Sequence, residues 1–185
     1  NGGEGQMRLP PGVWLPPHPW SRAKPTNPAK PPAWQKSYER FTGGESLASI
    51  AMTQASGKPI QVRAVAGHIL QAVEYALPID VARLSHESGS PLPNREEWLK
   101  MEEAEAALSI DVATGGDKAP LASYLIPALA KPFDERTESD KAAGNACYER
   151  LAWYMAFRRV GYTPEFGSDE HSATRTAVKR PIEVV

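Results

Sequence analysis

Residues 57–84, GKPIQVRAVAGHILQAVEYALPIDVARL, hold the pattern that decides the fold. Apolar side chains recur at steps of three and four from Val62 to Tyr75, which is the spacing of one buried face of an α-helix. Pro78 interrupts this pattern, and Asp80 can cap a short helix after it. The outer side of the longer predicted helix carries Arg63, Ala64, Gly67, Gln71 and Glu74.

Two further helices are predicted before this stretch. The segment WQKSYERF, residues 34–41, places its aromatic side chains on one helical stripe, and Gly43-Gly44 ends it. Ser46 can cap the next helix, because a serine side chain satisfies the free amides of a first helical turn. The apolar positions of that helix are Leu47, Ile50 and Ala51.

Three helical segments are predicted after the loop at residues 88–93. Asn94 and Glu97 form a variant capping box for a helix that closes at Gly115-Gly116. Its inward positions are Trp98, Met101, Ala104, Leu108 and Val112. A second segment breaks at Pro127. The last helix runs from about residue 140 to 160, with inward positions Ala143, Cys147, Leu151, Tyr154 and Phe157.

The first 33 residues differ in composition from the rest of the chain. They hold nine of the 18 prolines, which favours an extended arm that is poorly suited to helix or sheet. Residues 1–44 carry six Lys and Arg against two Glu, a net charge of +4, whereas the whole chain has a net charge of −1. The remainder is therefore −5, and residues 163–185 read as a polar tail.

A stiff segment loses little conformational entropy on binding, so the arm is predicted to dock on a partner. The alternatives are a flexible linker and an arm folded back on its own domain. The candidate docking side chains are Arg8, Trp14, Trp20, Arg22 and Lys24.

The order of residues across 34–84 resembles the helix-turn-helix domain near the C-terminus of RecQ-like and Werner-like helicases. The matching groups are Trp34…Tyr38…Phe41, Ser46-Leu47…Ile50-Ala51, Gly57-Lys58-Pro59-Ile60, Val65-Ala66-Gly67-His68-Ile69-Leu70 and Pro78-Ile79-Asp80…Arg83-Leu84. With a looser match further on, the resemblance spans about residues 34–162. It implies an all-α fold, a helix-turn-helix bundle of about six helices. The sequence departs from whole helicases, because it contains no Walker motif, no helicase core and no zinc-binding cysteine set.

In a helix-turn-helix, the second helix enters the major groove of DNA. The resemblance therefore implies a nucleic-acid surface on the helix that begins near Val62. Its candidate residues are Lys58, Gln61, Arg63, His68 and Gln71. A solvated face or a protein-binding surface is the alternative for the same residues. Gly67 costs helix stability and predicts a close helix crossing.

The sequence offers no constellation typical of an enzyme. The four histidines are isolated and Cys147 lies on an apolar helix face, so we expect no metal and no cofactor. Glu102 and Glu105 could pair as an acid and a base, but Glu103 beside them favours a solvated acidic face. We therefore expect a protein that binds rather than catalyses.

Two functional hypotheses follow. The first is a binding module of a nucleic-acid machine that contacts DNA or RNA. The second is a scaffold subunit of a large assembly, such as an organellar ribosome or another ribonucleoprotein, anchored on protein partners by its arm. No apolar run reaches the length of a membrane span. A single cysteine indicates a reducing compartment inside the cell, and an organelle is expected if a targeting peptide has been removed before Asn1.

Overall fold

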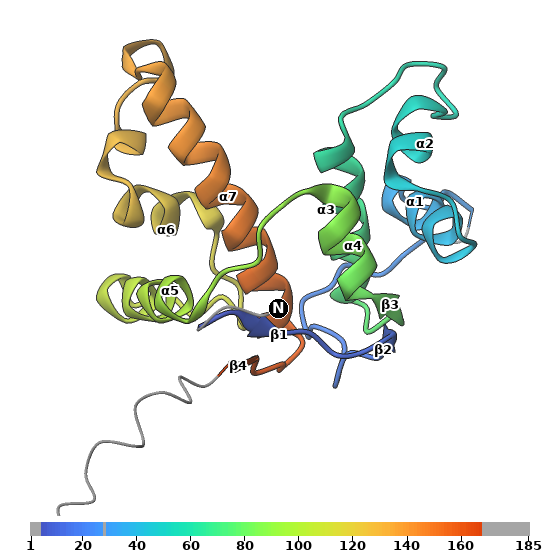
Figure 1. The fold of residues 1–185 in the computed structure, drawn as a ribbon, viewed down its shortest axis with the longest axis horizontal. Helices are drawn as coiled ribbons and strands as arrows, with labels where there is room; N and C mark the ends of the chain where they lie inside the picture. The colour runs from blue at the N-terminus through green and yellow to red at the C-terminus, as the bar shows by residue number, and fades with distance from the viewer. Residues whose placement is uncertain (1–4, 28, 168–185) are drawn as a thin grey trace, which may run out of the picture.

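The computed structural model describes residues 5–27 and 29–167 of the chain. These residues are mostly helical and form two lobes that meet where α3 packs against α7 (Figure 1). The first lobe holds α1 (Ala33–Thr42), α2 (Leu47–Met52), α3 (Val62–Val73) and α4 (Val81–Ser88). The second lobe holds α5 (Arg95–Leu108), α6 (Lys118–Leu125), the 3-10 helices η1 (Pro127–Ala130) and η2 (Phe133–Glu135), and α7 (Glu138–Arg159).

The helices of the first lobe begin where the sequence predicts. Ser46 caps α2 by accepting a hydrogen bond from the amide of Ser49, and Asp80 caps α4 by accepting one from the amide of Arg83. Helix α3 lies at the centre of this lobe and packs on α1, α2 and α4. The predicted inward side chains are Val62, Val65, Ile69, Val73 and Ala76. The middle three are fully buried, which confirms the apolar period, whereas the two at the ends of the stripe are only half-buried.

The second lobe is built around α7, whose buried side chains include the large aromatic residues Trp153, Tyr154 and Phe157. The Asn94–Glu97 capping box of α5 is confirmed, and Pro127 separates α6 from η1 as expected. The ring of Trp98 from α5 meets the ring of Tyr154 edge to face, with centroids 4.6 Å apart. Aromatic contacts between α5 and α7 therefore hold this lobe together.

The N-terminal arm contains two short strands, so the expectation that it is unsuited to sheet is wrong. Strand β1 (Met7–Arg8) pairs antiparallel with β4 (Glu165–Phe166), and β2 (Val13–Trp14) pairs antiparallel with β3 (Ile79–Asp80). The prolines lie outside these two-residue strands, so no proline has to donate a ladder hydrogen bond. The arm thus joins both lobes along their lower edge (Figure 1).

Three finer sequence expectations are wrong. Helix α5 ends at Leu108 rather than at Gly115-Gly116, because Ser109 adopts a left-handed conformation. As a result Leu108 is exposed instead of buried. Ala143 is also exposed, since α7 turns Gly144 toward Leu129 instead. Of the predicted polar tail, residues 165–166 form β4, while residues 168–185 lie outside the described part of the chain.

Candidate functional site

A groove runs between α3 and α7, with α6 at its rim, and we call it the α3–α7 groove. It consists of two adjoining hollows of about 250 and 280 Å³, which share Gly67, Leu70, Lys118 and Ala152. The residues that line only one of the two hollows are Arg63, Ala66, Gln71, Glu74, Ser88, Ser90, Asn145, Tyr148, Glu149, Trp153, Met155, Ala156 and Arg159. Side chains from both lobes therefore form one continuous surface.

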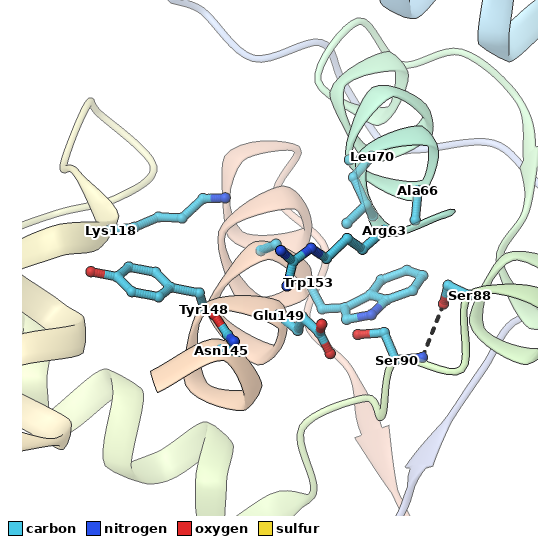
Figure 2. Close-up of a pocket in the computed structure, with 12 residues that line it drawn as sticks. Arg63, Ala66, Leu70, Ser88, Ser90, Lys118, Asn145, Tyr148, Glu149 and Trp153 are labelled. Carbon is cyan, nitrogen blue, oxygen red and sulfur yellow. Dashed lines mark hydrogen bonds between the residues drawn. The ribbon is translucent and has the colours of Figure 1, made fainter. Parts of the chain in front are cut away.

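The floor of the groove is apolar and contains one buried polar group without a partner. Ala66 and Leu70 of α3 lie against Ala152 and Trp153 of α7. The Trp153 side chain is 1% exposed, and its indole nitrogen finds no hydrogen-bond partner within residues 5–27 and 29–167. Figure 2 shows the indole reaching toward Ser88 and Ser90. A buried donor without an acceptor is costly, so it marks a place where a ligand can contribute binding free energy.

Two cationic side chains extend toward one another across the groove. Arg63 projects from α3 and Lys118 from the start of α6 (Figure 2). Neither forms an ion pair with any carboxylate of the described chain. The surrounding protein removes water from Lys118 and lowers its pKa, and the positive charge of Arg159 lowers that pKa further. An anion beside Lys118 would favour its charged form.

Polar side chains of α7 and of the loop after α4 complete the groove. Asn145, Tyr148 and Glu149 come from the two turns of α7 before Trp153 and line the hollow (Figure 2). The Ser90 amide donates a hydrogen bond of 3.2 Å to the Ser88 hydroxyl, which fixes the loop beside the indole. The hollow beside Trp153 therefore offers donors, one carboxylate acceptor and two cations around an apolar floor.

The far end of the groove is closed by an ion pair between the lobes. Arg159 of α7 lies 2.5 Å from a carboxylate oxygen of Glu74, and both side chains are mostly buried. The Arg159 guanidinium also stacks over the Trp20 ring of the arm, 4.1 Å from its centroid. This end of the groove is thus held by neutralised charge, which leaves the end with Arg63 and Lys118 as the positive one.

The predicted nucleic-acid residues divide into three groups in the structure. Arg63 and Gln71 line the groove, one turn above and one turn below Gly67. Lys58 and Gln61 are exposed just before α3 begins. His68 faces α1 instead, with its Nδ1 2.9 Å from the Ser37 hydroxyl, and desolvation lowers its pKa. The structure therefore brings two of the five residues together on one surface.

Gly67 corrects one sequence expectation. A Cβ atom added at this position would meet no atom within 4 Å, so Gly67 does not mark a close helix crossing. It lies instead on the wall of the groove, where the missing side chain leaves space. The penalty of a glycine within a helix is therefore not offset by closer packing.

The predicted docking residues of the arm also divide. The indole rings of Trp14 and Trp20 are half-buried against the protein itself. Trp14 meets Phe157 and Tyr162 edge to face at 5.6 and 5.0 Å, and the Trp20 indole donates a 2.7 Å hydrogen bond to the Ala113 carbonyl. The described arm is thus folded back on its own domain. Its charged residues Arg8, Arg22 and Lys24 remain exposed.

Glu105 overturns the expectation of a solvated acidic face on α5. Its side chain is 7% exposed, and it accepts hydrogen bonds from the Val112 amide at 2.6 Å and from the Tyr154 hydroxyl. Burial and this bond raise the pKa of Tyr154. Arg158 supplies a positive charge at 3.3 Å. This cluster connects α5 to α7 and to the loop after α5.

Sequence reasoning missed the half of the groove that α7 and α6 contribute. The signal was present, because Asn145, Tyr148, Glu149 and Ala152 recur at the three- and four-residue steps of one helix face. Lys118 carried no such signal, because only the packing of α6 on α7 brings it to the rim.

Within residues 5–27 and 29–167, no three His, Cys, Asp or Glu side chains gather closely enough to hold a metal ion. None of the helices in this part is long and apolar enough to cross a bilayer. Comparison with known protein families, curated proteins and solved structures found no match to this chain.

Proposed function

We propose that this protein is a non-catalytic binding module of a nucleic-acid-associated machine, and that α3 carries the contact. The observation that supports this proposal is the pair of cations, Arg63 and Lys118, that face the α3–α7 groove without a carboxylate partner in the described chain. Phosphate binding by Lys and Arg supplies most of the sequence-independent affinity for nucleic acids. Lys58 and Gln61 are exposed just before α3 begins, outside the groove.

A single strand suits this surface better than a duplex. A recognition helix must be free along one side to enter a major groove about 12 Å wide. Here α7 packs along α3 and forms the second wall of the groove. The connection from α2 to α3 also spans nine residues, 53–61, whereas a helix-turn-helix usually has a turn of about 3–4 residues. The proposal therefore departs from the major-groove contact that the resemblance implies.

Binding of fluorescent oligonucleotides tests the proposal. At low salt, the protein is expected to bind a mixed-sequence single strand more tightly than the matching duplex. The double variant Lys58→Ala with Arg63→Ala should weaken binding. It should also reduce the slope of log affinity against log salt concentration by the amount expected for about two phosphate contacts. Lys131→Ala, just after η1 in the other lobe, is the control and should change neither. If the wild-type protein binds neither oligonucleotide at low salt, the proposal is wrong.

The arm favours a second candidate function, that of a scaffold subunit in a large ribonucleoprotein such as an organellar ribosome. Val13 and Leu15 are 70% and 66% exposed on either side of the packed Trp14. Exposed apolar side chains on an extended segment suit a protein neighbour. The variant Val13→Asp with Leu15→Asp should prevent assembly in cells yet leave oligonucleotide binding unchanged. Migration of the native wild-type protein as a free monomer would contradict this second candidate.

A further inference from the structure

We propose that the α3–α7 groove binds a nucleotide, with its phosphate between Arg63 and Lys118 and its base beside Trp153 and Glu149. The inference rests on the proposed function, because it names the unit of nucleic acid that α3 contacts. It is nevertheless tested separately, since a mononucleotide reports on the groove without any longer strand.

The phosphate position follows from the arrangement of charge. Arg63 and Lys118 come from different helices and converge on the same space (Figure 2). Both side chains line the same hollow, and a phosphate group carries the negative charge and the acceptor oxygens that can satisfy two cations at once. Arg63 adds a planar fork of donors that matches phosphate oxygens. The ion pair between Arg159 and Glu74 makes the other end of the groove a weaker anion site.

The base position follows from the hydrogen-bonding groups at the opposite side. Trp153 holds a buried N–H without a partner in the described chain, and Glu149 lies on the same side with a carboxylate that can only accept when ionised. A base edge that presents an amino group can donate to the Glu149 carboxylate at this side of the groove. Cytosine offers such an edge through its N4 amino group, whereas uracil has a carbonyl oxygen at that place. The groove should therefore prefer cytosine to uracil.

The size of the groove sets the size of the ligand. The hollow beside Trp153 encloses about 250 Å³, just below the ~300 Å³ at which pockets for drug-sized ligands begin. That volume suits one pyrimidine nucleotide rather than a dinucleotide cofactor. The second hollow continues along Gln71, so the same site can hold a free nucleotide or one nucleotide within a strand.

Gly67 offers a variant that blocks the groove without disturbing the fold. A side chain here enters open space, and any residue with a better helix propensity than glycine should preserve or raise stability. Gly67→Leu should therefore fill the groove in a folded protein. Ala64→Leu places the same side chain on an exposed position of α3 that does not line the groove, and it is the matched control.

The experiment measures binding of cytidine and uridine 5′-monophosphates by calorimetry, and of ten-residue oligo(C) and oligo(U) RNA by fluorescence anisotropy. We expect the wild-type protein to bind the cytosine ligand about tenfold more tightly in at least one of the two arms. Glu149→Gln should remove this preference, and Lys118→Ala should weaken both ligands equally. Gly67→Leu should abolish binding, whereas Ala64→Leu should not. A preference in the oligonucleotide arm alone identifies a strand as the natural source.

The outcomes separate this inference from the proposed function. If the protein binds both oligonucleotides equally and Gly67→Leu has no effect, the nucleotide site is wrong while the proposed function stands. If it binds the monophosphate selectively but neither oligonucleotide, the site stands and the proposed function fails. If no ligand binds in either arm, both are wrong.

Discussion

The two lobes are stabilised in different ways, although each is a cluster of short helices around one central helix. In the first lobe, charged side chains on the surface hold the backbone. Arg83 donates hydrogen bonds to the carbonyls of Phe41 and Glu45 at 2.8 and 2.7 Å, and the Leu47 amide donates to Glu87 at 2.7 Å. In the second lobe, the corresponding charge is buried, with Glu105 beneath α7.

This difference indicates where a substitution is tolerated. A surface charge that loses its partner is solvated by water, so the pair contributes little. A buried hydroxyl or amide that loses its partner stays unsatisfied, because water cannot reach it. Each surface contact removed from the first lobe should therefore lower the free energy of unfolding by a small step. A single change in the buried cluster of the second lobe should lower it much more.

The largest expected effect is that of Glu105→Ala. The substitution leaves the Tyr154 hydroxyl and the Val112 amide without an acceptor in the core, and we expect a loss of about 3 kcal/mol in the free energy of unfolding. Urea unfolding measures this value. Glu45→Ala, which removes the solvated partner of Arg40 in the first lobe, is the contrasting variant and should lose far less. Equal losses would remove the distinction between the lobes.

The arm should rank second, because it contacts both lobes. Trp14→Ala removes the edge-to-face contacts with Phe157 and Tyr162 and should cost about 2 kcal/mol of unfolding free energy. Leu15→Ala, at the next position but exposed to solvent, should stay within about 0.5 kcal/mol of the wild type. If Trp14→Ala were as harmless as Leu15→Ala, the packed arm would contribute nothing to stability.

The same contrast explains what the sequence predicted. Caps and apolar periods act within a few residues, so Ser46, Asp80 and the Asn94–Glu97 box located helix starts correctly. The end of α5 depends on Glu105, which reaches seven residues ahead to the Val112 amide, and no local pattern contains that bond. Glu105 nevertheless follows Met101 by four residues, so it lies on the apolar stripe of its helix.

The groove and the arm were less predictable because both depend on distant parts of the chain. The sequence identified Arg63 and Gln71 from the outer face of α3, but Lys118 and Trp153 join them only through tertiary packing. The short strands of the arm pair with partners 65 to 159 residues away, as in Trp14 with Ile79 before α4 and Met7 with Phe166 after α7. Two-residue strands show no alternation, so their pairing leaves no sequence signal.

A third prediction sharpens the description of the first lobe. Arg83→Lys keeps the charge but loses the fork that bonds the carbonyls of Phe41 and Glu45 together. We expect a loss of about 1 kcal/mol, measured by the midpoint of urea unfolding. Arg95→Lys, on the exposed start of α5, is the control and should change the midpoint little. An unchanged midpoint for Arg83→Lys would show that its positive charge alone suffices.

The smallest effect concerns the pH dependence of stability at the contact between α1 and α3. Desolvation lowers the pKa of His68 below its ordinary value of about 6.5, so the unfolded chain takes up a proton more readily than the folded protein. The stability contributed by neutral His68 is therefore complete above pH 6.5 and declines as the pH falls through the folded pKa. His68→Asn keeps a polar group opposite Ser37 without a titrating ring. Urea unfolding at pH 7.5 and 5.5 should show a smaller loss for this variant than for the wild type. The carboxylates are the same in the wild type and in the variant, so they contribute equally to both losses. An equal loss in the two would therefore mean that His68 is as well solvated in the folded state as in the unfolded chain.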